Sequence, residues 1–133
     1  MTHFAKKMVP VLSVAVLGGA SLAHAGATYQ MAWCGKSPNG SGYCHGTFLG
    51  FRNDSGASTQ AYFYKSDSGF KTFYGAFTNP LGELVTAGCI ADAATGALWS
   101  KALAHEGYFS IEWDSNGTCT YLYLANSSQY STF

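Results

Sequence analysis

The chain has 133 residues, of which 16% are aromatic and only 11% charged, with seven acidic and seven basic side chains. A chain of this length is expected to form one domain. With so few Lys and Arg residues it has no basic patch, which excludes nucleic acid and anionic lipid as partners.

The first 25 residues have the three parts of a secretory signal. Two lysines precede an apolar run over residues 8–17, and Ala-His-Ala at residues 23–25 fits a small-x-small cleavage site. The run is too short for a comfortable membrane span, so we expect no membrane insertion after signal cleavage. Residues 26–133 would then form a single β-rich domain, secreted or periplasmic, with five basic and seven acidic residues and a net charge of −2.

All four cysteines follow the signal, and an even number in a small exported domain indicates two disulfides. Three pairings are possible. We predict Cys34–Cys44, across a turn rich in Gly, Pro, Asn and Ser, and Cys89–Cys119, between two expected strands. No CxxC pair is present, and the histidines lack ligand spacing, so we expect no metal site and no cofactor.

Seven segments have the short length and composition typical of β-strands, with turn residues between them. They cover residues 28–33, 43–51, 58–66, 70–78 and 83–91 and the two arms of a hairpin within 107–125. Gly75 inside the fourth segment suggests a bulge or a close backbone approach. Residues 92–107 are ambiguous: we predict a short helix around 95–105 with Thr95 as its cap, and an irregular crossover is the alternative.

The hairpin is the clearest local signal. Apolar residues alternate with polar ones in its first arm, and Asn116-Gly117 predicts a two-residue type I′ turn. That turn would place Phe109 opposite Leu124, Ile111 opposite Leu122 and Trp113 opposite Thr120. Cys119 would then share the other face with Tyr121 and Tyr123. One hairpin cannot bury such a stripe alone, so the remaining strands must pack on it.

Seven short strands at a spacing near ten residues favour an all-β fold. We predict a small disulfide-stabilised antiparallel β-sandwich, with a small β-barrel as the alternative and one short helix around residues 95–105.

Tyrosine supplies the candidate ligand-binding residues. If the strands that carry them are neighbours in one sheet, a single surface would hold Tyr62, Tyr64, Tyr74, Tyr121 and Tyr123, with Gln60, Ser110 and Glu112 as polar neighbours. Flat rings with polar rims can stack on sugars or on another protein. Trp99, in the ambiguous stretch, is the tryptophan expected to be exposed to a ligand. The alternative is that tyrosine simply suits half-buried sheet positions.

Three functional hypotheses follow. The first is a small secreted, non-catalytic binding protein whose partner is a glycan or an extracellular protein. The second is a small hydrolase with a site around His105, Glu106 and Glu112, although the chain has neither a GxSxG nor an HExxH motif. The third is a structural subunit that assembles through exposed strand edges. The sequence leaves the oligomeric state open.

Overall fold

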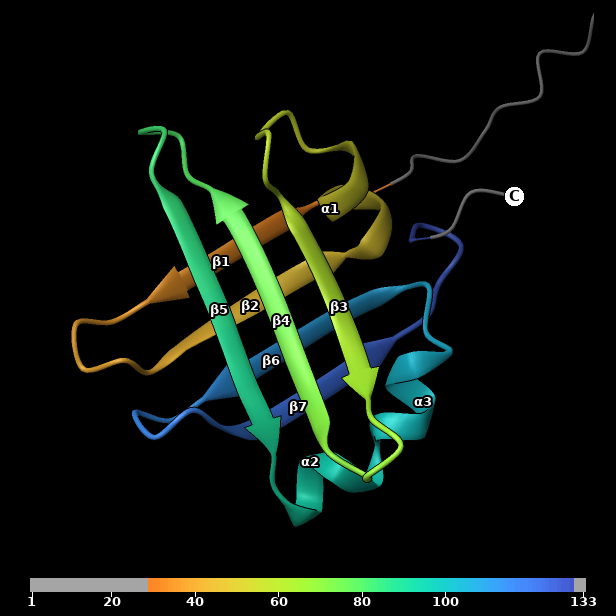
Figure 1. Cartoon of the computed structure of the whole chain (residues 1–133). Helices are drawn as coiled ribbons and strands as arrows, with labels where there is room; N and C mark the ends of the chain where they lie inside the picture. The colour runs from red at the N-terminus through yellow and green to blue at the C-terminus, as the bar shows by residue number, and fades with distance from the viewer. Residues whose placement is uncertain (1–28, 131–133) are drawn as a thin grey trace, which may run out of the picture.

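The computed structural model describes residues 29–130; the expected secretory signal, residues 1–25, lies outside this range. Seven strands and three short helices follow one another along the chain (Figure 1). They are β1 (Ala32–Lys36), β2 (Gly42–Thr47), α1 (Phe48–Asn53), β3 (Gln60–Lys65), β4 (Lys71–Thr78), β5 (Leu84–Ala91), α2 (Ala93–Ala97), α3 (Trp99–Leu103), β6 (Tyr108–Trp113) and β7 (Thr118–Ala125). No helix in this part of the chain is long and apolar enough to cross a membrane.

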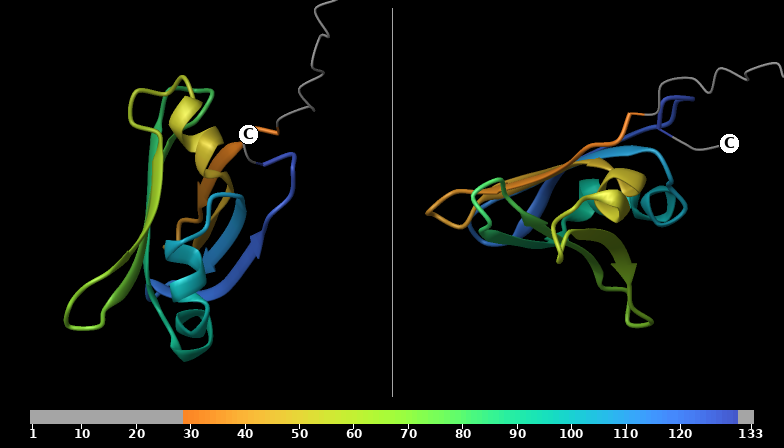
Figure 2. Two further views of the ribbon diagram at one scale, coloured as in Figure 1. Left: turned by 90° about the vertical axis from the view of Figure 1, so that its right-hand side faces the viewer. Right: turned by 90° about the horizontal axis from the view of Figure 1, so that it is seen from above.

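The seven strands form one mixed sheet in the order β1-β2-β6-β7-β5-β4-β3. Neighbours are antiparallel except β5 and β7, which run parallel and pair at only two positions, Ile90 with Thr118 and Ala91 with Cys119. The sheet bends at this short junction, so that β3, β4 and β5 cross in front of β1, β2, β6 and β7 (Figures 1 and 2). The prediction of a two-sheet sandwich is therefore wrong, because the junction makes the two halves one sheet. The barrel alternative is also wrong, because the sheet is not closed and β1 and β3 remain its edges.

The core lies between the two halves of the bent sheet and is built mainly from phenylalanine and tryptophan. The rings of Phe63, Phe73 and Phe109, from β3, β4 and β6, lie 5.1–5.7 Å apart. Other large buried side chains are Phe51, Phe77, Trp99, Ile111 and Trp113. None of the nine tyrosines, all of them in the described part of the chain, is buried there. A buried tyrosine hydroxyl needs a hydrogen-bond partner, and burying it without one is costly, whereas a phenyl ring has no polar group to satisfy.

Both predicted disulfides are present. Cys34 and Cys44 are directly opposite each other on β1 and β2, and Cys89–Cys119 joins β5 to β7 where the halves of the sheet meet. Gly75 of β4 lies against the first disulfide: a Cβ there would be 2.9 Å from the Cys44 sulfur. Gly75 therefore marks a close approach, but of side-chain atoms and not of backbone as expected, and it brings β4 against β2 across the core.

The helical parts of the chain differ from expectation. The strand expected over residues 43–51 ends at Thr47, whose hydroxyl accepts a hydrogen bond from the Gly50 amide (2.9 Å) and caps α1. The helix expected around residues 95–105 is two helices, α2 and α3. The cap of α2 is Asp92, not Thr95, because the Asp92 carboxylate accepts from the Thr95 amide (2.7 Å).

The β6–β7 hairpin has the predicted register through most of its length, with Phe109 opposite Leu124 and Ile111 opposite Leu122. The type I′ turn is wrong. Gly117 has a positive φ (76°), but Asn116 does not. The Asp114 carboxylate accepts hydrogen bonds from the amides of Asn116 and Thr118, both at 2.9 Å. These bonds favour a three-residue loop that ends in a left-handed glycine.

A register shift between Glu112 and Trp113 accompanies this loop. Trp113 lies opposite Cys119 instead of Thr120, so Cys119 is on the core side of β7 and is completely buried. The expectation that Cys119 shares a face with the β7 tyrosines is therefore wrong. The inward position is what lets Cys119 reach Cys89.

Candidate functional site: a tyrosine-lined groove

The tyrosines on the strands lie on the two outer faces of the bent sheet. The front face, the outer side of β3, β4 and β5, carries Tyr62, Tyr64 and Tyr74. The rear face, the outer side of β1, β2, β6 and β7, carries Tyr43, Tyr108, Tyr121 and Tyr123. Figure 2 shows that the two halves face each other, so their outer sides point in opposite directions. The structure thus brings together three of the five predicted tyrosines and separates Tyr121 and Tyr123 from them.

On the front face, strand pairing places two tyrosine rings in contact. Tyr62 is directly opposite Tyr74, and their rings stack with centroids 5.3 Å apart and an interplanar angle of 29°. Tyr64 is the next outward residue of β3 and lies opposite Thr72. Tyr62 and Tyr64 are each about half exposed, 48% and 52%. The period of two along β3 therefore builds a row of aromatic rings on the solvent side.

Glycine leaves a hollow beside this row. Gly88 of β5 pairs with Tyr74 on the side away from Tyr62. A Cβ at Gly88 would meet only the Phe73 carbonyl oxygen, at 3.6 Å, so the space over it is open. A strand residue with a side chain would fill this position.

The hollow is part of a shallow groove of about 620 Å³. The β6–β7 loop forms the side opposite the tyrosines and is tied to β5 by a hydrogen bond from the Ile90 amide to the Gly117 carbonyl (2.9 Å). The groove is lined by Tyr62, Tyr64, Thr72, Phe73, Tyr74, Gly88, Cys89, Ile90, Asn116 and Gly117. None of these residues is charged, so the groove combines aromatic surface with neutral hydrogen-bonding groups.

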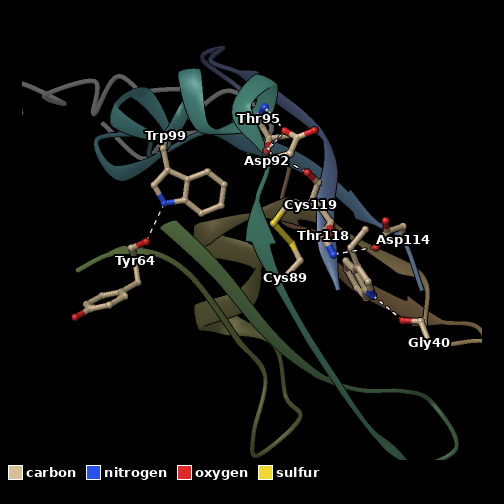
Figure 3. The surroundings of a disulfide bond; sticks show 10 residues. Gly40, Tyr64, Cys89, Asp92, Thr95, Trp99, Asp114, Thr118 and Cys119 are labelled. Atoms are coloured by element: carbon tan, nitrogen blue, oxygen red, sulfur yellow. Dashed lines mark hydrogen bonds between the residues drawn. A yellow bond between two sulfur atoms is a disulfide. The ribbon is translucent and has the colours of Figure 1, made fainter. Parts of the chain in front are cut away.

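Trp99 does not belong to this site. Its ring is completely buried, and its Nε1 donates a hydrogen bond to the Tyr64 carbonyl (2.9 Å). Figure 3 shows the indole on one side of β3 and the Tyr64 ring pointing away from it. The expected exposure of Trp99 is wrong because residues 99–103 are helical and pack Trp99 and Ala102 into the core. Trp99 instead fixes the backbone that presents Tyr64.

The rear face is more occupied by its own side chains. Tyr43 stacks on His45 at 5.6 Å, and the Trp33 Nε1 donates to the Tyr43 hydroxyl (3.3 Å). Burial lowers the pKa of His45, because it disfavours the charged ring. Burial, and next the neighbouring Tyr130, raises the pKa of Tyr108.

The three residues proposed for a hydrolase are not brought together. Glu112 is on the rear face, opposite Tyr43 and Tyr121. His105 and Glu106 line a second cleft of about 440 Å³, together with Arg52. Arg52 is not among the predicted site residues. It is in the last turn of α1, and the sequence signal for this helix is Thr47, a residue that can cap a helix. Within residues 29–130, no group of three His, Cys, Asp or Glu side chains could hold a metal ion.

No protein-family model matches this chain, and no curated protein and no solved structure is significantly similar to it. The structure itself defines a mostly-β domain with two disulfides and an exposed tyrosine cluster on its sheet. Two disulfides indicate an oxidising, extracellular compartment.

Proposed function

We propose that this protein is a small exported, non-catalytic binding protein that recognises a glycan in the front groove. The observation that carries the proposal is the neutral groove in which the Tyr62–Tyr74 stack and Tyr64 stand beside the open position at Gly88. The expected signal at residues 1–25 would deliver it across the cytoplasmic membrane.

The chemistry of the groove matches the chemistry of a sugar. A pyranose ring has C–H groups that can lie against an aromatic ring, while its hydroxyls point outward. The front-face tyrosines offer such rings with polar rims. Asn116 and Thr72, also in the lining, supply an amide and a hydroxyl that can donate to and accept from sugar hydroxyls. The absence of charged residues from the lining suits an uncharged glycan.

The size of the groove favours a short stretch of glycan over a protein surface. Its volume of about 620 Å³ falls in the range of small-ligand sites. A stable protein–protein interface buries roughly 800 Å² on each partner, more than a groove of this kind offers. If no glycan binds, a protein partner or self-assembly becomes the preferred hypothesis.

The test is a pull-down of the disulfide-bonded protein on insoluble and immobilised polysaccharides, followed by fluorescence titration of any hit. We expect saturable binding that Tyr62→Ala or Tyr64→Ala weakens about fivefold or more, since stacking on one aromatic ring contributes on the order of 1 kcal/mol. Tyr121→Ala is the matched control: it removes a ring of similar exposure, 46%, from the rear face.

Binding that survives the Tyr62 change but is lost with Tyr121→Ala would contradict the front-groove assignment. Absence of binding across the whole panel would contradict glycan recognition. Circular dichroism of each variant shows whether the fold is intact.

A further inference from the structure

A second cleft opens on the side of the molecule where the sheet is not closed. Its lining residues come mainly from α1, the start of β3 and the connection from α3 to β6, and it has a volume of about 440 Å³. It shares no lining residue with the front groove. The two sites are therefore separate.

The floor of this cleft is aromatic. Phe48 and Phe51, both on α1, line it, and their rings pack on Phe109 of the core at 5.0 and 5.5 Å. Ala61 of β3 adds a small apolar residue. The floor is thus continuous with the rigid core and suits an apolar side chain.

The rim carries two opposite charges on different elements. Arg52 is in the last turn of α1, and Glu106 is in the connection between α3 and β6. Both side chains are exposed to solvent. Each charge therefore remains available for a ligand group of opposite sign.

His105 adds an acceptor next to Glu106. Its Nε2 lies 2.7 Å from the Tyr108 carbonyl oxygen, which can only accept, so Nε2 carries the proton. In the neutral ring Nδ1 is then an unprotonated acceptor, a group that favours a bound ammonium.

We infer that this cleft binds a small zwitterion with an apolar side chain, of the size of a dipeptide. Arg52 would hold the carboxylate, for which its planar guanidinium is well suited. Glu106 and His105 would hold the ammonium group, and the apolar side chain would rest on Phe48 and Phe51. The volume of about 440 Å³ leaves room for a dipeptide, and the two charged residues come from separate elements of the fold.

Isothermal titration calorimetry of the disulfide-bonded protein with the dipeptide Ala-Phe tests this inference. We expect saturable binding that weakens about tenfold when the amino group is acetylated or the carboxylate is amidated. Free phenylalanine, which carries the same charges closer together, should bind more weakly than Ala-Phe.

Variants assign each charge. Arg52→Gln should weaken Ala-Phe about tenfold and leave the affinity for the amidated peptide unchanged, and Glu106→Gln should do the same for the acetylated peptide. Lys101→Gln, an exposed charge on α3 outside the cleft, is the control and should change nothing.

The inference would be overturned if Ala-Phe did not bind, or if the acetylated and amidated peptides bound as tightly as Ala-Phe itself. It would also be overturned if neither Arg52→Gln nor Glu106→Gln changed the affinity for Ala-Phe. Tyr62→Ala should not affect the Ala-Phe affinity, so this result is independent of the glycan proposal.

Discussion

Single residues determine where the sheet is packed tightly and where it is open. Gly75 of β4 pairs with Ala87 of β5, and Gly88, the next residue of β5, pairs with Tyr74 of β4. The two glycines nevertheless face opposite sides of the sheet. At Gly75 the Cys34–Cys44 disulfide occupies the space of a side chain, whereas at Gly88 that space is open to solvent. The sequence suggested close approach at Gly75, but nothing in it distinguished Gly88.

Alanine at these two positions should have opposite consequences. We expect Gly75→Ala to lower the free energy of unfolding by about 1–3 kcal/mol, because its Cβ would lie 2.9 Å from the Cys44 sulfur. Gly88→Ala should leave stability unchanged or slightly higher, since a strand glycine is replaced in open space. Urea denaturation of both variants measures the difference, and equal stabilities would contradict the close packing.

His45 should make stability depend on pH. Its folded pKa is lowered by burial, so as pH falls below about 6.5 the unfolded chain takes up a proton that the folded chain resists. The contribution of neutral His45 to the free energy of unfolding should therefore be fully present above that pH. It should decline as the pH falls toward the lowered folded pKa. The melting temperature of His45→Gln should fall less than that of the wild type between pH about 7 and about 5. Parallel profiles would refute this role for His45.

At the scale of secondary-structure elements, local sequence patterns predicted some features of the structure and missed others. The register of β6 with most of β7 was predicted from a two-residue turn that the hairpin does not have. It is still correct, because the register shift between Glu112 and Trp113 offsets the longer loop. The loop type was not predictable from Asn116-Gly117 alone, because the Asp114 carboxylate stabilises a longer loop. The start of α1 was missed because Phe48 and Leu49 suit a strand as well as a helix.

The hairpin loop gives a test at this scale. Gly117→Val should lower the melting temperature, because a β-branched residue resists the positive φ of 76° at this position. Gly117→Asn should be milder, since asparagine tolerates the left-handed region better. Calorimetry of the two variants would contradict the loop conformation if valine and asparagine had the same effect.

At the scale of the whole molecule, the bend in the sheet depends on a very short contact. β5 and β7 pair at two positions only, and the Cys89–Cys119 disulfide fastens them there. Strand patterns and cysteine spacing predicted the seven strands and both pairings. They could not show that one strand pair would join the halves, because strand adjacency depends on tertiary packing. For the same reason the five tyrosines could not be assigned to faces.

Removing each disulfide should reveal the difference between them. In the chain-entropy model, the closed loop of 30 residues contributes about 3.5 kcal/mol and the loop of 10 about 2.5 kcal/mol. We therefore expect the Cys89→Ser/Cys119→Ser pair to lower the free energy of unfolding more than Cys34→Ser/Cys44→Ser. If the two double variants lost the same free energy of unfolding, or if Cys34→Ser/Cys44→Ser lost more, the Cys89–Cys119 disulfide at the junction would not be the more stabilising of the two.

The central claim is that the hollow over Gly88, beside the front-face tyrosines, is the binding site. The most direct measurement is the affinity of Gly88→Leu for the polysaccharide that the wild type binds, because leucine fills the hollow and leaves every tyrosine in place. We predict an intact fold with binding reduced at least tenfold, while Tyr121→Ala retains wild-type affinity. Undiminished binding by Gly88→Leu would show that the glycan lies elsewhere on the molecule.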